Sequence, residues 1–182
     1  PSDDAAEYRL VDLRDGGVVI NGPVFTLGLR SCPSYDIELN DTPSLPLGGP
    51  GTAIKMHREM SAALAPLAAA LSLGIMEGSF DCARAYAGER RQGGRTIARW
   101  PEVKMMLASM AVEIENAVAA LEGALLSGKG GPALALRCGE SSCRVTSDGV
   151  QVLGGNGYMR DYFQEKRMRD AAQARFLLGN PY

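Results

Sequence analysis

Residues 101–153 read PEVKMMLASMAVEIENAVAALEGALLSGKGGPALALRCGESSCRVTSDGVQVL. In the first half, apolar side chains recur every three or four residues and form one stripe: Val103, Met106, Met110, Ile114, Val118, Leu121 and Leu125. This period is typical of an amphipathic helix, which we predict over Pro101–Ser127. The glycine-rich run 128–132 ends in proline, a residue favoured in the first turn of a helix. A second helix is therefore predicted over Ala133–Leu153.

Helices are also predicted on either side of this pair. Residues Thr52–Gly88 are rich in Ala and Leu, with apolar residues at helical spacing at Leu64, Leu67, Leu71 and Ile75. Pro66 within this stretch predicts a kink or a helix start. A shorter helix is predicted over Tyr162–Asp170. Long antiparallel helices with short connections form a bundle, so residues 51–182 are predicted to be an up-and-down four-helix bundle in a mainly α protein.

Residues 1–50 have a different composition and hold six of the ten prolines. Their short alternating segments predict strands at Tyr8–Leu13, Gly17–Ile20, Val24–Leu27 and Tyr35–Leu39. Asn21-Gly22-Pro23 is predicted to be a turn. A few strands without a closed sheet would expose their edges, so we expect this β segment to lean on another part of the protein. We also expect the chain not to be a stable monomer.

Composition narrows the function classes. The 182 residues carry a net charge of -2 and a pI of about 5.5, which argues against nucleic-acid binding. Gly, Pro, Ser and charged residues interrupt the apolar runs, so no membrane span is expected, and no charged-then-apolar leader opens the chain. Cys32, Cys82, Cys138 and Cys143 form no CxxC pair, and His57 is the only histidine. We therefore expect reduced cysteines, no metal site and a cytoplasmic location.

A glycine-rich corner follows the predicted third helix. It reads QVLGGNGYMRD over residues 151–161, and EKRMRD follows over 165–170. Three glycines in four residues allow a tight turn whose backbone can closely approach a ligand or another chain. No strand precedes the corner, so a Rossmann phosphate loop is a poor fit. The alternative interpretation is a helix C-cap followed by a charged, solvated helix.

The corner closely resembles the C-terminal signature of the acyl-CoA dehydrogenase family. The matching positions are Gln151, Gly154, Gly155, Gly157, Tyr158, Asp161, Lys166 and Asp170. Residues 83–94, ARAYAGERRQGG, resemble the family's Tyr-Ala-x-Glu-Arg-x-x-Phe-Gly segment. Residues 27–56 are similar to the end of the family's middle β-domain. The chain thus resembles the C-terminal helical domain plus the tail of the β-domain.

The resemblance implies an FAD site shared between subunits that pair through their helical domains. It places Arg90 at the flavin pyrophosphate, and Gln151 and the Gly154-Gly155 backbone at the adenosine half, with Gln92 as a further cofactor contact. A guanidinium suits a diphosphate because its hydrogen bonds are directional and charge-assisted. Gly93 stands where the family has Phe, which removes an apolar face against the cofactor. The alternative for Arg90 is a solvated basic helix end.

The resemblance further implies an acyl-CoA thioester substrate, a homo- or hetero-oligomer, an electron-transfer flavoprotein as partner and a role in fatty acid metabolism. In a eukaryote it implies the mitochondrial matrix. Family chemistry removes a proton from the thioester α-carbon, for which a carboxylate base is required. The residue at the usual glutamate position is Leu178, followed by Gly179, and the position used by a minority of the family falls at Leu64-Ala65.

The catalytic base is therefore unassigned. Leucine cannot accept a proton, although the backbone N–H of Leu178 could still donate to a thioester carbonyl. Glu59 would point away from the helix face of Leu64, and His57 lies on nearly the same face but ~10 Å along the axis. The leading hypothesis is a component of an FAD-dependent acyl-CoA dehydrogenase. The alternatives are a non-catalytic structural or assembly subunit, and a relative whose flavin chemistry needs no carboxylate.

Overall fold

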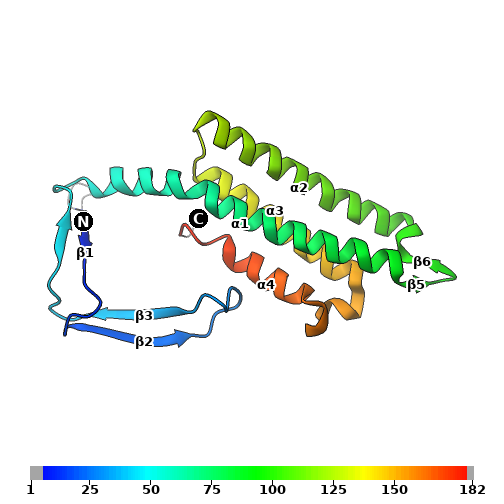
Figure 1. Ribbon diagram of the computed structural model, residues 1–182, viewed down its shortest axis with the longest axis horizontal. Helices are drawn as coiled ribbons and strands as arrows, with labels where there is room; N and C mark the ends of the chain where they lie inside the picture. The colour runs from blue at the N-terminus through cyan, green and yellow to red at the C-terminus, as the bar shows by residue number, and fades with distance from the viewer. Residues whose placement is uncertain (1–5, 180–182) are drawn as a thin grey trace. The chain divides into compact units, whose positions relative to one another are not determined.

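The computed structural model describes residues 6–179, which fall into two compact units (Figure 1). The first takes in the described residues up to Thr26 together with Arg30–Ser61. The second takes in Leu27–Leu29 and the described residues from Ala62 onward. The domain boundary predicted at residue 50 stays a prediction.

The first unit contains two antiparallel strand pairs. Strand β1 (Tyr8–Leu10) pairs with β4 (Leu45–Leu47), and β2 (Val18–Val24) pairs with β3 (Ser34–Leu39). Most of the side chains on β2 and β3 are exposed.

The predicted turn at Asn21-Gly22-Pro23 is wrong. These residues lie inside β2, where the register shifts between Asn21 and Val24 and the Gly22–Pro23 peptide is cis. Proline has no N–H for the ladder, and an irregularity of this kind lets the strand continue past it. The strand predicted at Gly17–Ile20 therefore continues to Val24, and the strand predicted at Val24–Leu27 is wrong beyond its first residue, because residues 25–27 are not part of a strand.

The second unit holds the helical bundle. Its helices are α1 (Ala53–Glu89, of which the first residues belong to the other unit), α2 (Pro101–Ser127), α3 (Pro132–Leu153) and α4 (Gln164–Ala174). Successive helices run in alternating directions (Figure 1), which confirms the predicted mainly α bundle. The fourth helix lies a few residues later than predicted, because 3-10 turns at Gly154–Tyr158 and Arg160–Tyr162 precede it.

Helices α1, α2 and α3 build the bundle core, and most of the residues that α1 contributes are small. Helix α1 contributes Ala69, Met76, Ala83 and Ala87, α2 contributes Met110 and Ala117, and α3 contributes Cys138, Val145, Val152 and Leu153. The leucines used to predict α1 are not part of that core. Leu64, Leu67 and Leu71 are 39%, 67% and 42% exposed, because α1 turns its alanines and serines toward the other helices. Helix α1 runs on through Pro66.

Helix α1 is long and apolar enough, by length and composition alone, to cross a membrane. This differs from the expectation that Gly, Pro, Ser and charges interrupt every such run. Core helices pass the same test, and in this chain Ala65, Ala69, Met76 and Ala83 of α1 are fully buried against the bundle.

A polar contact between α2 and α3 adds to this packing. Glu113 of α2 accepts hydrogen bonds from the Ser141 hydroxyl at 2.6 Å and from the Arg144 guanidinium at 3.2 Å. The Ser141 hydrogen bond is the main cause that lowers the pKa of Glu113 below its usual value. A carboxyl whose pKa is lowered by folding stabilises the protein above its unfolded pKa, and this contribution is lost as the pH falls through the folded pKa.

We expect Ser141→Ala to lower the free energy of unfolding by about 1–2 kcal/mol at pH 7, because it removes a hydrogen bond to a charged group. The loss should shrink as the pH falls through the lowered pKa of Glu113, because a protonated Glu113 no longer offers Ser141 a charged acceptor. Urea unfolding at pH 7 and pH 3 measures both values. Ser109→Ala, at an exposed position of α2, controls for helix propensity. Equal effects of the two substitutions at pH 7 would contradict the assignment.

Candidate functional site

A pocket of about 620 Å³ lies at one end of the bundle, within the second unit. The end of α1, the segment that leads into α2, the start of α2 and the end of α3 all contribute to it. Its lining residues are Tyr86, Arg90, Gln92, Gly93, Ile97, Trp100, Val103, Gln151, Val152, Leu153, Gly154, Gly155 and Asn156. The structure therefore brings together all five residues predicted to contact a cofactor: Arg90, Gln92, Gln151, Gly154 and Gly155.

The wall around Arg90 is shaped by a short hairpin. Helix α1 ends at Glu89, and the Arg90 N–H still donates to the Tyr86 carbonyl at 2.8 Å. Strands β5 (Arg91–Gln92) and β6 (Arg95–Thr96) then pair around Gly93 and Gly94, whose φ angles are +62° and +80°. A two-residue hairpin turn with two positive φ angles favours glycine at both positions.

The opposite wall is the glycine corner. Helix α3 ends at Leu153 and is capped by Gly154, whose φ is +58° and whose N–H donates to the Gln151 carbonyl. A Cβ on Gly157 would lie 2.5 Å from the Val150 carbonyl oxygen, so the chain folds back closely on α3 here. The corner is thus the predicted helix C-cap as well as part of the pocket wall.

Arg90 carries the only full charge among the lining residues that the structure describes. It follows the C-terminal end of α1, where a helix dipole favours a cation. Within residues 6–179, its guanidinium has no hydrogen-bond or ion-pair partner, and no carboxylate lines the pocket. The side-chain amides of Gln92 and Gln151 add further donors. This donor set suits an anionic ligand such as a diphosphate.

Trp100 supplies an aromatic wall that the sequence analysis missed. Its indole N–H donates to the Gln92 carbonyl at 3.3 Å, and the Arg95 guanidinium carbon lies 3.7 Å from the ring centroid. A Cβ on Gly93 would lie 2.8 Å from the indole Cζ2. The ring thus crowds the space that a side chain at residue 93 would need, so the absence of a Phe there does not leave the pocket without an apolar face. Trp100 is the chain's one tryptophan, and this alone could have marked it as a candidate site residue.

Other signature residues lie outside the pocket lining and hold the chain together. The Asp170 carboxylate pairs with Lys166 and accepts the Leu29 N–H at 2.7 Å. Gln173 accepts the Gly28 N–H at 2.9 Å. A Cβ on Gly28 would lie 2.2 Å from the Arg169 carbonyl oxygen, so segment Leu27–Leu29 packs directly on α4. Asp170 and Lys166 therefore anchor this segment.

The positions considered for the catalytic base are apolar or engaged elsewhere. Leu178 follows α4, is half-buried and does not line the pocket. In the first unit, the His57 ring lies 2.9 Å from the Tyr8 hydroxyl, and Glu59 lies 3.9 Å from Lys55. Across the described part of the chain, no cluster of His, Cys, Asp and Glu side chains could hold a metal ion.

Comparison with known proteins gives consistent matches. The family model for the acyl-CoA dehydrogenase C-terminal domain matches residues 58–181. A probable acyl-CoA dehydrogenase, FadE25 of Mycobacterium tuberculosis, is 31% identical over 174 residues, which cover 89% of this chain and 44% of that protein. A 3-sulfinopropanoyl-CoA desulfinase of Paraburkholderia xenovorans is 38% identical over 110 residues, 57% of this chain and 28% of that protein.

Solved structures agree on the fold. Butyryl-CoA dehydrogenase from Megasphaera elsdenii superposes with a TM-score of 0.87 at 22% identity, covering 98% of this chain and 49% of that chain. A structure of the electron transferring flavoprotein of Acidaminococcus fermentans gives a TM-score of 0.83 at 29% identity, covering 92% of this chain and 47% of that chain. The chain spans about half the length of the proteins it matches.

We expect Gly93→Ala to disturb Trp100, whereas Gly94→Ala should not. Both positions have positive φ, so both substitutions carry the same kind of backbone cost of about 1 kcal/mol. Only at Gly93 would the new Cβ meet the indole; around Gly94 the space is open. The tryptophan emission maximum should therefore shift in Gly93→Ala and stay in Gly94→Ala. Identical spectra for the two variants would show that the indole does not pack on residue 93.

Proposed function

The chain belongs to the acyl-CoA dehydrogenase family, and from that premise we propose that it forms the C-terminal helical part of an FAD-dependent acyl-CoA dehydrogenase. The observation that carries this proposal is the pocket at the ends of α1 and α3, where Arg90, whose guanidinium has no partner among residues 6–179, lines the wall together with glutamine side chains and glycine backbone. We propose a cytoplasmic location, an electron-transfer flavoprotein as partner, and a role in fatty acid metabolism as parts of the same assignment.

The pocket fits the chemistry of FAD in three respects. Arg90 offers a diphosphate two parallel hydrogen bonds, and no lining carboxylate within the described chain opposes it. The Gly155 backbone can be approached closely, since a Cβ there would meet no atom within 4 Å. Trp100 and Ile97 give an apolar wall for a flat ring. When bound, FAD would supply a hydride acceptor for the substrate β-carbon.

The site needs further protein to be complete. The chain covers 44% of FadE25 and 28% of the Paraburkholderia desulfinase, and its pocket is open. Leu67 of α1 and Met105, Leu125 and Leu126 of α2 are strongly exposed. Burying such a surface is favourable at ~25 cal/mol per Å² of apolar area, which supports assembly through the helical domain with a second subunit.

The missing base favours a second candidate function. Leu178 occupies the position at which the family resemblance places glutamate, and a leucine cannot accept the α-proton. The desulfinase relatives act, by their name, on 3-sulfinopropanoyl-CoA, so family membership alone does not fix the reaction. We therefore keep hydrolytic cleavage of the C–S bond of a sulfinoacyl-CoA, in which a proton from water replaces the sulfinate group and the sulfur leaves as bisulfite, as the alternative to dehydrogenation. A purely structural subunit is the third possibility, and it predicts no FAD binding.

Arg90→Ala should weaken FAD binding to the full-length protein about tenfold or more, because it removes charge-assisted hydrogen bonds to the diphosphate. Equilibrium dialysis with detection of flavin absorbance measures the affinity. Arg91→Ala is the matched control, since the Arg91 guanidinium bonds the Gly94 carbonyl and lies outside the pocket lining. If the two variants lose affinity equally, Arg90 has no special role at the cofactor.

Leu178→Glu should speed flavin bleaching by an acyl-CoA in the FAD-loaded full-length protein by about 10²-fold, the lower range for general-base catalysis. Leu178→Gln, with the same size and no basic carboxylate, should leave the rate unchanged. Circular dichroism must first show that both variants fold, because a carboxylate at this half-buried position costs stability. Fast bleaching in the unmodified protein that neither variant alters would place the base on another residue or chain. Loss of sulfinate from 3-sulfinopropanoyl-CoA without bleaching would favour the alternative reaction.

A further inference from the structure

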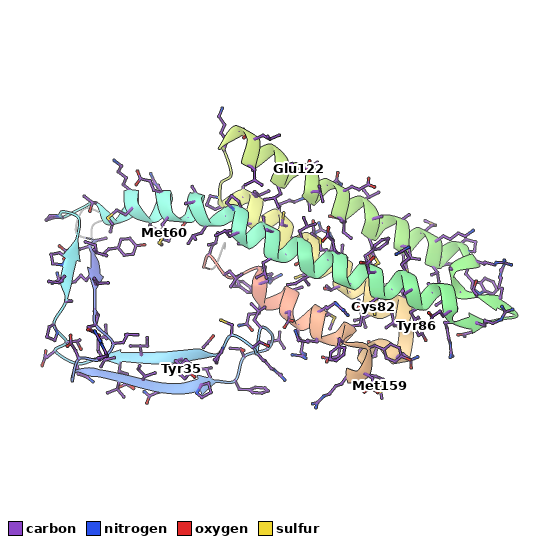
Figure 2. The ribbon with its side chains drawn as sticks, viewed as in Figure 1. Tyr35, Met60, Cys82, Tyr86, Glu122 and Met159 are labelled. Carbon is purple, nitrogen blue, oxygen red and sulfur yellow. The ribbon has the colours of Figure 1, made fainter. Side chains whose placement is uncertain are left out.

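A triangle of polar and aromatic groups joins the end of α1 to the glycine corner. The side-chain amide of Asn156 donates to the Tyr86 hydroxyl at 2.9 Å and to the Tyr162 hydroxyl at 3.3 Å. The two tyrosine rings meet edge to face, with centroids 5.8 Å apart and an interplanar angle of 89°. Figure 2 shows Tyr86 near the end of α1, one turn beyond Cys82.

The Asn156 contact decides what the Tyr86 hydroxyl can do. A phenol both accepts and donates hydrogen bonds, and Asn156 uses its acceptor side. Within residues 6–179 the Tyr86 O–H has no acceptor of its own, and its side chain lines the pocket. Tyr86 also lies one helical turn before Arg90, and residues four apart share a helix face. Its hydroxyl hydrogen is therefore available on the side of the pocket where the one full positive charge lies.

We propose that Tyr86 is a ligand-binding residue of this pocket, whose hydroxyl donates a hydrogen bond to a phosphate oxygen of the diphosphate that Arg90 binds. Asn156 holds the phenol in place by donating to its oxygen, so the O–H hydrogen points away from the corner. The inference rests on the proposed FAD site and adds a neutral donor beside the guanidinium. Hydrogen bonds to an ionised acceptor are among the strong ones, which makes the effect measurable.

Tyr162 provides an internal control. It also has a phenol hydroxyl that accepts from the Asn156 amide, and its ring meets the Tyr86 ring edge to face, but Tyr162 does not line the pocket. Removing either hydroxyl weakens the triangle. Only removal of the Tyr86 hydroxyl takes a donor away from the ligand.

The test compares Tyr86→Phe and Tyr162→Phe in the full-length protein, with Arg90→Ala as reference. Affinities for FAD, and for ADP as a diphosphate without a flavin, are measured by equilibrium dialysis, and the melting temperature is measured without ligand. Tyr86→Phe should weaken both ligands about tenfold, and Tyr162→Phe less than about twofold, with similar melting temperatures for the two variants.

Equal affinity losses in the two tyrosine variants would show that the triangle is only structural and would overturn the inference. A Tyr86→Phe variant that loses affinity for FAD but not for ADP would also overturn the inference, because both ligands carry the diphosphate. If the parent binds FAD and Arg90→Ala weakens it while Tyr86→Phe does not, the inference fails and the proposed function stands. If the parent protein binds no FAD, both fail.

Discussion

The close packing of α3 on α1 at Gly149 positions the two helix ends that line the pocket. A Cβ on Gly149 would lie 2.4 Å from the Ser79 hydroxyl and 1.9 Å from the Gln164 amide, so no other residue fits without movement. Gln164, fully buried at the start of α4, donates to Ser79 across the same point. Because Gly149 has no side chain, the buried Gln164 amide and the Ser79 hydroxyl fit against α3 here, and the end of α3 lines the same pocket as the end of α1. That places the glycine corner opposite Arg90.

The pocket and the predicted base position are separate parts of the helical unit, because Leu178 does not line the pocket. They also differ in the functional groups that their residues offer. The pocket keeps a cation, two glutamine amides and open glycine backbone, with Trp100 as its aromatic wall. At the position predicted for the base, the sequence has Leu178, which cannot accept a proton, followed by Gly179. Binding and chemistry therefore need separate tests. A protein can keep a cofactor-binding pocket while its reaction differs. The proteins that this chain matches include desulfinases as well as dehydrogenases, judged by their names.

Much of the helical unit was predictable from the sequence because its apolar residues recur regularly at helical spacing. Helix α2 has the bounds predicted from its apolar stripe. The two segments that resemble the family, residues 83–94 and the glycine corner, predicted pocket residues that lie 61 positions apart, at Arg90 and Gln151. Trp100 and Tyr86 were missed because their roles depend on contacts with Gly93 and Asn156 that no local pattern reveals. The turn at residues 21–23 was wrong because a Gly-Pro pair can also lie within a strand as an irregularity. Apolar spacing predicted α1, but it could not show that small residues form its buried face.

Hydrogen exchange with and without FAD tests the central claim most directly, because it reports where the cofactor lies independently of catalysis. The full-length protein should show slower amide exchange on FAD binding in residues 86–97 and 150–157, which surround the pocket. Residues 115–127, in the half of α2 away from the pocket, should exchange at an unchanged rate. Bound FAD, seen by its absorbance, without any slowing in the first two segments would contradict the account.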